Sequence, residues 1–267
     1  MAAIELSAHV TGIGLLGPGL TDWRSAVAVL AGERPYRAAP TVLPVVEALP
    51  PAERRRTGAT VRLACAVAQQ AVSEAGADAA ELKTVFSSSG ADGAICHEIC
   101  STLASDDRQV SPTRFHNSVH NAAAGYWSIA MQATAPSTAL CAFDGSFAAG
   151  LLEAMTLAAV DAAPVLLVAY ETGYPQPLRA KRPLPDAFGV ALLLDPRPAA
   201  RPCARICLSL TDADAERMAD PPLEALRAQV PAARSLPLLR RLARGESGGA
   251  VLEYLQQRIR VQVSQCR

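Results

Sequence analysis

The stretch STALCAFDGSFAAGLLEA, residues 137–154, combines a short strand, a sharp turn and the start of a long helix. The run over 138–143 is apolar and has the length of a strand, and Phe147 and Leu151 then recur at helical spacing. A strand that turns into a buried helix exposes free backbone N–H groups and the positive end of the helix dipole. Many α/β enzymes place a nucleophile or an anion at such a turn. Here the turn carries a carboxylate, Asp144, whose alternative role is to cap the helix.

Segments with the length and composition of strands lie on both sides of this stretch. They cover residues 4–10, 83–87, 164–170, 188–194 and 204–210. The last two are joined by Asp-Pro-Arg-Pro, which predicts a hairpin. Helices are predicted between the strands, most clearly at 59–75, and again in the tail, where they include 250–258. The element order predicts an α/β fold with a mixed sheet flanked by helices and a helical C-terminal tail.

The glycines that follow the first predicted strand have to be compared with the glycine pattern of dinucleotide-binding sites. Gly12, Gly14 and Gly17 match GxGxxG. In that fingerprint the helix begins among the glycines, whereas Pro18 and Gly19 follow directly here. We therefore interpret the run as a glycine-rich turn from strand to helix, and the sequence implies no cofactor.

Charge and cysteine content restrict the classes of partner. Lys and Arg balance Asp and Glu at 25 each, which gives no electrostatic basis for binding nucleic acid or an anionic membrane. No apolar run reaches the roughly 18 residues of a membrane span, and the N-terminus lacks the basic start of a signal peptide. An odd number of scattered cysteines is typical of reduced thiols in a cytoplasmic protein. They are Cys65, Cys96, Cys100, Cys141, Cys203, Cys207 and Cys266.

Three further groups of residues are candidates for a site. The turn at 87–90, Ser-Ser-Ser-Gly, either receives an anion or allows tight packing. His116 and His120 either act in acid–base chemistry or form local hydrogen bonds. Cys96 and His97 point to different faces of their predicted helix and no paired CxxC exists, so no metal is expected.

Small residues followed by bulky ones predict close helix packing, with aromatic side chains at an interface or lining a cavity. The bulky residues are Tyr126, Trp127, Ile129 and Met131.

Four segments look like successive landmarks of a β-ketoacyl synthase. They are SPTRFHNSVHNAAAGYWSIAM (111–131), CAFDGSFAAGLLEAM (141–155), VLLVAYE (165–171) and RPLPDAFGVALLLD (182–195). The opening VTGIGLLGPGLTDW (10–23) also resembles the family's N-terminal strand and turn. The resemblance implies a thiolase-like fold, in which two similar α/β halves make one subunit and subunits pair. It divides the chain into a β-ketoacyl synthase N-terminal-like domain (1–210) and a helical C-terminal extension (211–267), which packs on that domain or on a partner.

The chain departs from the family pattern at two places. The family's nucleophilic cysteine falls on Asp144, unless the alignment slips by three residues and places Cys141 there. A carboxylate cannot carry a thioester, whereas a cysteine thiolate is strongly nucleophilic. The family's two catalytic histidines belong to its second half, and His116 and His120 do not correspond to them. We therefore do not expect condensation by this chain alone.

Chain-length factors offer a use for such a subunit, since they resemble ketosynthases and lack the cysteine. The hypothesis is a half-sized member that pairs with an active ketosynthase and shapes the acyl tunnel. The ketosynthase elongates a chain bound to acyl carrier protein, such as the polyene of bacterial aryl-polyene pigments. Tyr126, Trp127 and Met131 are expected to limit product length at the closed end of the tunnel. The full set of tunnel or interface residues is Phe115, His116, His120, Tyr126, Trp127, Met131 and Phe143.

Two alternatives stay open. The chain is an acyl-transfer enzyme that uses Cys141 or Ser146 with a histidine as base, or it is a non-catalytic scaffold for a ketosynthase or carrier protein. A half-fold also has to cover the sheet face that the second half covers in a complete ketosynthase. Either a partner provides that cover, or leucines of the tail do: Leu223, Leu226, Leu236 and Leu239.

Overall fold

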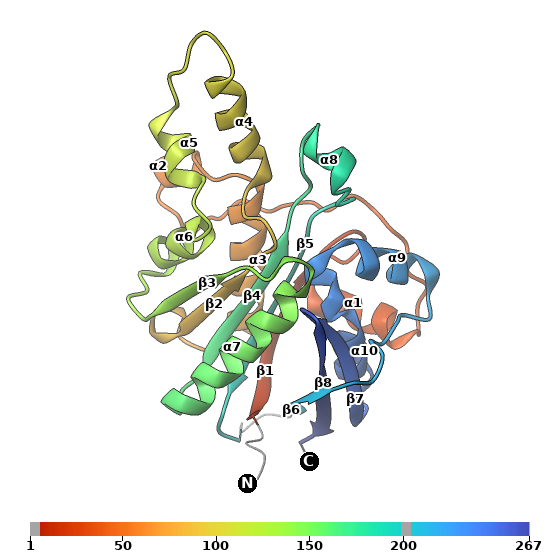
Figure 1. The fold of residues 1–267 in the computed structure, drawn as a ribbon. Helices are drawn as coiled ribbons and strands as arrows, with labels where there is room; N and C mark the ends of the chain where they lie inside the picture. The colour runs from red at the N-terminus through yellow and green to blue at the C-terminus, as the bar shows by residue number, and fades with distance from the viewer. Residues whose placement is uncertain (1–5, 199–203, 267) are drawn as a thin grey trace.

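The computed structural model describes residues 6–198 and 204–266, which fold around one mixed eight-stranded sheet (Figure 1). The strand order is β3-β2-β4-β5-β1-β6-β8-β7; β2 is parallel to β3 and β4, and the other pairs are antiparallel. The strands are β1 (Leu6–Leu16), β2 (Lys83–Ser87), β3 (Ser137–Leu140), β4 (Val165–Glu171), β5 (Phe188–Asp195), β6 (Ala204–Thr211), β7 (Gly248–Tyr254) and β8 (Gln257–Gln265). The predicted mixed sheet is confirmed, although the first residues of the predicted strand 4–10 lie outside the described residues.

Helices cover both faces of the sheet. On one face α3 and α6 pack, and on the other α1, α7, α9 and α10 pack. The helices are α1 (Trp23–Ala31), α2 (Pro51–Arg54), α3 (Ala59–Ala75), α4 (Gly93–Leu103), α5 (Pro112–Asn117), α6 (Ala122–Met131), α7 (Ser146–Asp161), α8 (Leu178–Lys181), α9 (Pro221–Gln229) and α10 (Leu236–Arg244). Short 3₁₀ segments are η1 (Ala79–Glu81), η2 (Phe143–Gly145) and η3 (Pro231–Ser235). The helix predicted at 59–75 is therefore confirmed as α3.

The central strand β4 shows why its sequence is an unbroken apolar run. Its odd-numbered residues 165–169 lie in the core cluster that contains α7, and its even-numbered residues 166–170 lie in the cluster that contains α3. Successive side chains of a strand point to opposite faces, so a strand covered on both sides buries every residue. Each such side chain contributes about 2 kcal/mol when it is removed from water.

The glycine-rich run lies mostly inside β1, which corrects the interpretation of 12–17 as a turn. A Cβ atom on Gly12 would lie 2.1 Å from the Ala71 carbonyl oxygen, and one on Gly14 would lie 1.9 Å from the Val67 carbonyl oxygen. The glycines therefore allow the backbone of α3 to pack directly on the strand. The turn itself begins only at residue 17, after β1 has ended.

The C-terminal extension ends in strands, which corrects the prediction of a wholly helical tail. After α9, η3 and α10 the chain forms the β7–β8 hairpin, so the helix predicted at 250–258 is wrong. β8 pairs with β6 from Ala204–Gln265 to Thr211–Arg258 and thus continues the same sheet. Apolar residues at 259, 261 and 263 alternate with polar ones, and this period of two is the strand signal.

The four leucines expected to cover the sheet do so. Leu223 and Leu226 of α9 and Leu236 and Leu239 of α10 are each at most 5% exposed. All four belong to the core cluster shared with α7 and the sheet. The extension therefore packs on the domain itself.

Two predicted connections also differ. β5 and β6 are not a hairpin, because β1 lies between them and pairs antiparallel with both. The strand predicted at 138–143 ends at Leu140, since the chain has to turn before α7. Apolar runs in the sequence predict where these strands lie, but the partner of each strand in the sheet depends on segments far away in the sequence.

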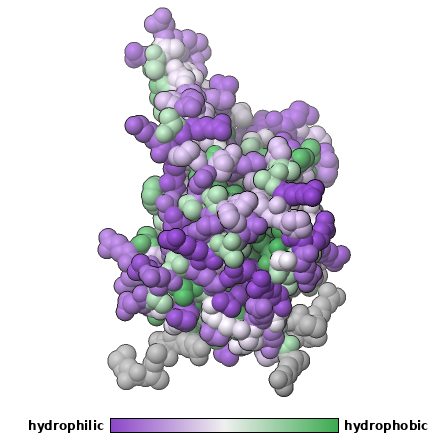
Figure 2. Space-filling view, turned by 90° about the vertical axis from the view of Figure 1, so that its right-hand side faces the viewer, coloured by the Kyte–Doolittle hydropathy of each residue, from purple (hydrophilic) through white to green (hydrophobic). Residues whose placement is uncertain are grey.

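A projecting arm is formed by α4 and α5 (Figure 1), and it rises above the rest of the surface in Figure 2. Only Gly93 of α4 and Asn117 of α5 are buried. The two helices are joined by an ion pair between Glu98 and Arg114, at 2.7 Å. Phe115 lies on this arm and is 66% exposed.

Candidate functional site

The carboxyl ends of the three neighbouring strands β3, β2 and β4 meet near the start of α7 (Figure 1). β2 leads into the segment 87–89, β3 is followed by Cys141, and β4 ends at Glu171. The turn that carries Asp144 follows within a few residues. Because ligands of open α/β sheets bind at this edge, it is the candidate site.

The turn before α7 is closed by its own side chains and backbone. Phe143 has a left-handed φ of 49° and is 62% exposed. The Ser146 hydroxyl accepts a hydrogen bond from the Ala142 N–H (3.1 Å) and donates one to the Phe143 carbonyl (2.6 Å). Ser146 is buried, and both of its bonds serve the turn, which disfavours it as an acyl nucleophile.

Asp144 is held between two arginines. Its carboxylate forms ion pairs with Arg182 at 2.7 Å and with Arg234 at 3.1 Å. The alternative that Asp144 caps α7 is wrong, because the N-cap is Gly145 and no side chain bonds there. Arg182 also lies over the Phe143 ring, with 4.1 Å between its guanidinium carbon and the ring centroid, a cation–π contact.

Glu171 is a site residue that the sequence analysis missed. It is 2% exposed and accepts hydrogen bonds from the Ser89 N–H (2.6 Å) and hydroxyl (2.8 Å). Burial raises the pKa of Glu171 to about 7, although the bonds from Ser89 and the nearby charge of Arg182 act to lower it. The sequence did contain a signal for this residue, namely an acidic side chain at the end of a fully apolar strand.

Cys141 and His120 both contact the segment that follows β2. The Cys141 thiol is exposed and donates to the Ser89 carbonyl oxygen at 3.4 Å. His120 Nε2 lies 3.1 Å from the Ser88 carbonyl oxygen. The histidine is thus engaged with backbone rather than with the thiol, which is the local hydrogen-bonding alternative.

The serines of the turn at 87–90 bond within the protein. The Ser87 hydroxyl donates to the Ser146 carbonyl oxygen at 2.6 Å, and the Ser89 hydroxyl is held by Glu171. These bonds fix the carboxyl end of β2 against α7 and β4. The tight-packing alternative for this turn is therefore the one that the structure favours over anion binding.

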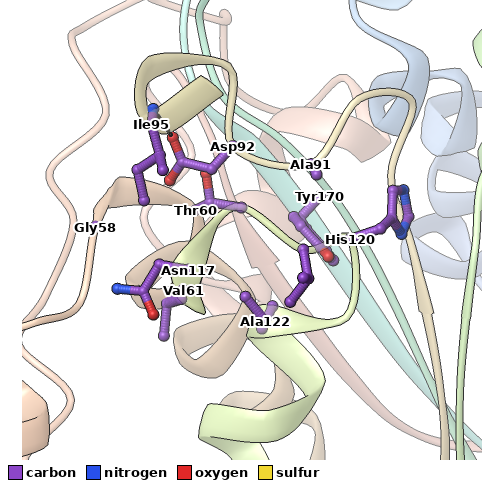
Figure 3. A pocket seen from close by; sticks show the side chains of 12 residues that line it. Gly58, Thr60, Val61, Ala91, Asp92, Ile95, Asn117, His120, Ala122 and Tyr170 are labelled. Atoms are coloured by element: carbon purple, nitrogen blue, oxygen red, sulfur yellow. Dashed lines mark hydrogen bonds between the residues drawn. The ribbon is translucent and has the colours of Figure 1, made fainter. Parts of the chain in front are cut away.

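A small cavity lies between the starts of α3, α4 and α6 and the end of β4 (Figure 3). Its volume is about 10 Å³, which is room for about one water molecule. His120, Asp92 and Tyr170 line it, and the Tyr170 hydroxyl is buried without a hydrogen-bond partner among the described residues. Of the proposed tunnel residues, only His120 reaches this cavity.

Of the bulky residues of α6, Tyr126, Trp127 and Met131 pack into the protein, whereas Ile129 is 45% exposed. Tyr126 and Trp127 are at most 2% exposed and lie in the core cluster with α3, and Met131 packs against that cluster. The Tyr126 hydroxyl donates to Asn117 Oδ1 at 3.0 Å, and the His116 ring lies edge-on to the Tyr126 ring. These residues are therefore separated from Phe115 and Phe143, which face the solvent.

In residues 6–198 and 204–266 no three potential ligands come together at a metal site. Cys203 lies outside the described residues. The segment Phe143–Asp161 is long and apolar enough to cross a membrane, which corrects the expectation that no such run exists, and half of its apolar 18-residue window is buried inside the protein.

A family model described as "Beta-ketoacyl synthase, N-terminal domain" matches residues 29–255. Curated protein sequences give no significant match. A solved ketosynthase (ApeO) in complex with its chain length factor (ApeC) from Xenorhabdus doucetiae contains a similar chain. The TM-score is 0.72 at 25% identity, over 96% of this chain and 99% of that one.

Two other solved structures share the fold at lower identity. A type II polyketide acyl-carrier protein in complex with its ketosynthase, AntDE:AntF, contains a chain matched at TM-score 0.71 and 12% identity, over 97% of this chain and 99% of that one. Ketosynthase twelve of the bacillaene synthase from Bacillus amyloliquefaciens matches at TM-score 0.53 and 14% identity. There the match covers 79% of this chain but 46% of that one.

The family model covers most of the chain, and the fold matches ketosynthase structures along nearly its whole length. The expected thiolase-like fold is thereby confirmed. The chain belongs to the β-ketoacyl synthase N-terminal domain family.

Proposed function

We propose that this chain is a catalytically deficient, chain-length-factor-like subunit that pairs with an active ketosynthase. The observation that carries the proposal is the share of each solved chain over which the fold matches. Chains from complexes of ketosynthases with a chain length factor or a carrier protein are covered to 99%, whereas the bacillaene ketosynthase is covered to 46%. The match thus spans nearly the whole of chains found in such complexes, which supports the proposal of a partner subunit.

The chemistry of the turn supports the same proposal. By the family resemblance Asp144 stands where a ketosynthase has its nucleophilic cysteine. The carboxylate lies between Arg182 and Arg234 and cannot carry a thioester. The turn is therefore suited to a structural role, and the condensing cysteine comes from the partner.

The proposed contacts with the ketosynthase begin with exposed side chains. Phe115 on the arm and Phe143 on the turn are more than 60% exposed, as expected for anchors of an interface that forms with another subunit. His116 lies on α5 of the arm and His120 lies between α5 and α6, and both are placed in the same contact. Tyr126, Trp127 and Met131 lie behind this proposed contact surface and limit the length of an acyl chain.

The partners follow from this assignment. The complex elongates a chain carried by an acyl carrier protein, for which an aryl-polyene precursor is the proposed product class. The protein acts in the cytoplasm, without nucleic acid or membrane as a partner and without a cofactor of its own.

Product length in a reconstituted system tests the proposal. Trp127→Ala should lengthen the product, but Trp127 is fully buried and its loss also costs about 3–5 kcal/mol of stability. Met131 is only partly buried, so Met131→Ala should lengthen the product and Met131→Trp should shorten it. Val160→Ala, on the exposed side of α7, is the control. If every variant makes product of the wild-type length, the tunnel assignment is wrong. If the variants change the product yield but not the product length, the scaffold alternative is favoured.

A second candidate function is acyl transfer by Cys141, favoured by its exposed thiol at the carboxyl edge of the sheet. A thioester probe should then label the wild type, and Cys141→Ala should abolish the label. Labelling that is absent, or that persists in Cys141→Ala, would exclude this function.

A further inference from the structure

The C-terminal extension reaches the turn before α7 through Arg234 of η3. One terminal nitrogen, Nη2, lies 3.1 Å from Asp144 Oδ2, and the other, Nη1, lies 3.0 Å from Glu253 Oε2. Its side chain is only 18% exposed, so these pairs are less screened by solvent than ordinary surface pairs. A single guanidinium therefore joins the turn to the last hairpin.

The ion pairs continue into the extension. Glu253 of β7 also pairs with Arg227 of α9 at 3.2 Å, and Arg227 pairs with Glu224 at 2.8 Å. The Arg227 side chain is 8% exposed. The turn is thus connected by charge to η3, β7 and α9, three elements of the extension.

A backbone contact lies beside the ion pairs. The turn of the β7–β8 hairpin places the Leu255 backbone nitrogen so close to Gly145 that a Cβ atom there would lie 2.9 Å away. The turn before α7 and the hairpin turn therefore touch directly. Only a glycine at 145 allows this approach.

The two touching turns share an unusual conformation. Phe143 and Leu255 each have a φ of 49°, in the left-handed region that disfavours large side chains. Both side chains are exposed, at 62% and 65%, so neither is held there by burial. Residues in such conformations persist where the surrounding structure over-determines them.

We propose that the C-terminal extension is a latch that fixes the turn before α7, with Arg234 as the positioning residue. The ion pair to Asp144 and the backbone contact at Gly145 hold the turn from two sides. Phe143 is thereby presented to the solvent in one conformation. The consequence for partner binding rests on the proposed function, in which Phe143 contacts the ketosynthase.

Amide hydrogen exchange of the full chain tests the latch without any partner. Arg234→Gln should speed exchange of the amides at 143–146 about tenfold and should speed alkylation of Cys141 in the same way. Gly145→Ala, which pushes the hairpin turn away, should act alike. Arg234→Lys reaches only one of the two carboxylates and should rescue partly. Arg197→Gln is the control, since that side chain is 64% exposed and its ion pair with Asp195 involves neither carboxylate of the latch.

The outcomes separate the latch from the proposed function. Unchanged exchange at 143–146 in both Arg234→Gln and Gly145→Ala would overturn the latch. If Arg234→Gln does not fold, Asp144→Asn removes the contact from the other side, where the side chain is 36% exposed, and Arg182→Gln is measured beside it because Asp144→Asn also removes the pair with Arg182. In a binding assay with the ketosynthase, Arg234→Gln should weaken affinity about tenfold. If the wild-type protein does not bind the ketosynthase, the proposed function is refuted. The hydrogen-exchange data test the latch independently of that result.

Discussion

Glu171 at the end of β4 accepts two hydrogen bonds from Ser89, one from its N–H at 2.6 Å and one from its hydroxyl at 2.8 Å. The Ser89 carbonyl oxygen in turn accepts a hydrogen bond from the thiol of Cys141, the residue that follows β3. The pair therefore ties together the carboxyl ends of β2, β3 and β4. A buried carboxylate is costly to keep charged, so this arrangement depends on pH.

Stability should fall as the pH rises through neutrality. Because burial raises the pKa of Glu171 to about 7, above its value in the unfolded chain, the protonated form favours the folded state. Its contribution is complete below about pH 4.5 and is lost above pH 7, a loss of up to about 3 kcal/mol. Denaturant unfolding between pH 5 and pH 8 measures this slope. Glu171→Gln should flatten it, and equal slopes in the two proteins would refute the assignment.

Gly14→Ala should destabilise the protein by about 3 kcal/mol or more, because the new methyl group would meet the backbone of α3 at the Val67 carbonyl. Gly125→Ala is the matched control. Gly125 lies within α6 with open space around it, so alanine there should stabilise the helix by about 0.5–1 kcal/mol. Urea unfolding of both variants checks the pair, and a mild effect of Gly14→Ala would show that the contact can relax.

Thiol labelling should distinguish the cysteines of the site from those of the core. Cys141 is exposed, whereas Cys65 is 1% exposed and burial raises its pKa to about 12. At pH 7.5 an alkylating reagent should modify Cys141 on the order of 100-fold faster than Cys65. Peptide mass spectrometry gives both rates. Comparable rates would mean that the α3 side of the core opens readily.

Asp144→Cys should not confer condensing activity on the isolated chain. The substitution supplies a thiol at the turn, but the family's histidine pair has no counterpart in His116 or His120. His120 is engaged with the Ser88 carbonyl, and His116 lies against Tyr126. A malonyl condensation assay with the variant measures this directly, and turnover above that of the wild type would contradict the proposal of a non-condensing subunit.

Local periodicity carried much of the fold prediction. Helix 59–75 and the buried strand at 164–170 follow from apolar spacing, and both are found within one residue of the expected bounds. The hairpin β7–β8 was missed because Val251, Leu252 and Leu255 can also form one helical face. Its strand character depends on the pairing of β8 with β6, whose paired residues lie 47 to 61 positions earlier, and a local pattern does not contain that pairing.

The site was predictable only in part for the same reason. The turn at Asp144 follows from a strand, a break and a helix in sequence. Its partners Arg182 and Arg234 lie 38 and 90 residues away, and nothing in their local sequence marks them. Trp127 lies in the core cluster with α3, and its role at a tunnel stays a prediction, since a bulky residue on a helix looks the same in sequence in either place.

The measurement that tests the central claim most directly is the native mass of the protein, alone and co-expressed with a ketosynthase from the same gene neighbourhood. Pairing predicts a stable one-to-one assembly that survives size-exclusion chromatography and appears as one species in native mass spectrometry. A monomer or homodimer that remains unchanged in the presence of an active ketosynthase would contradict the proposed function.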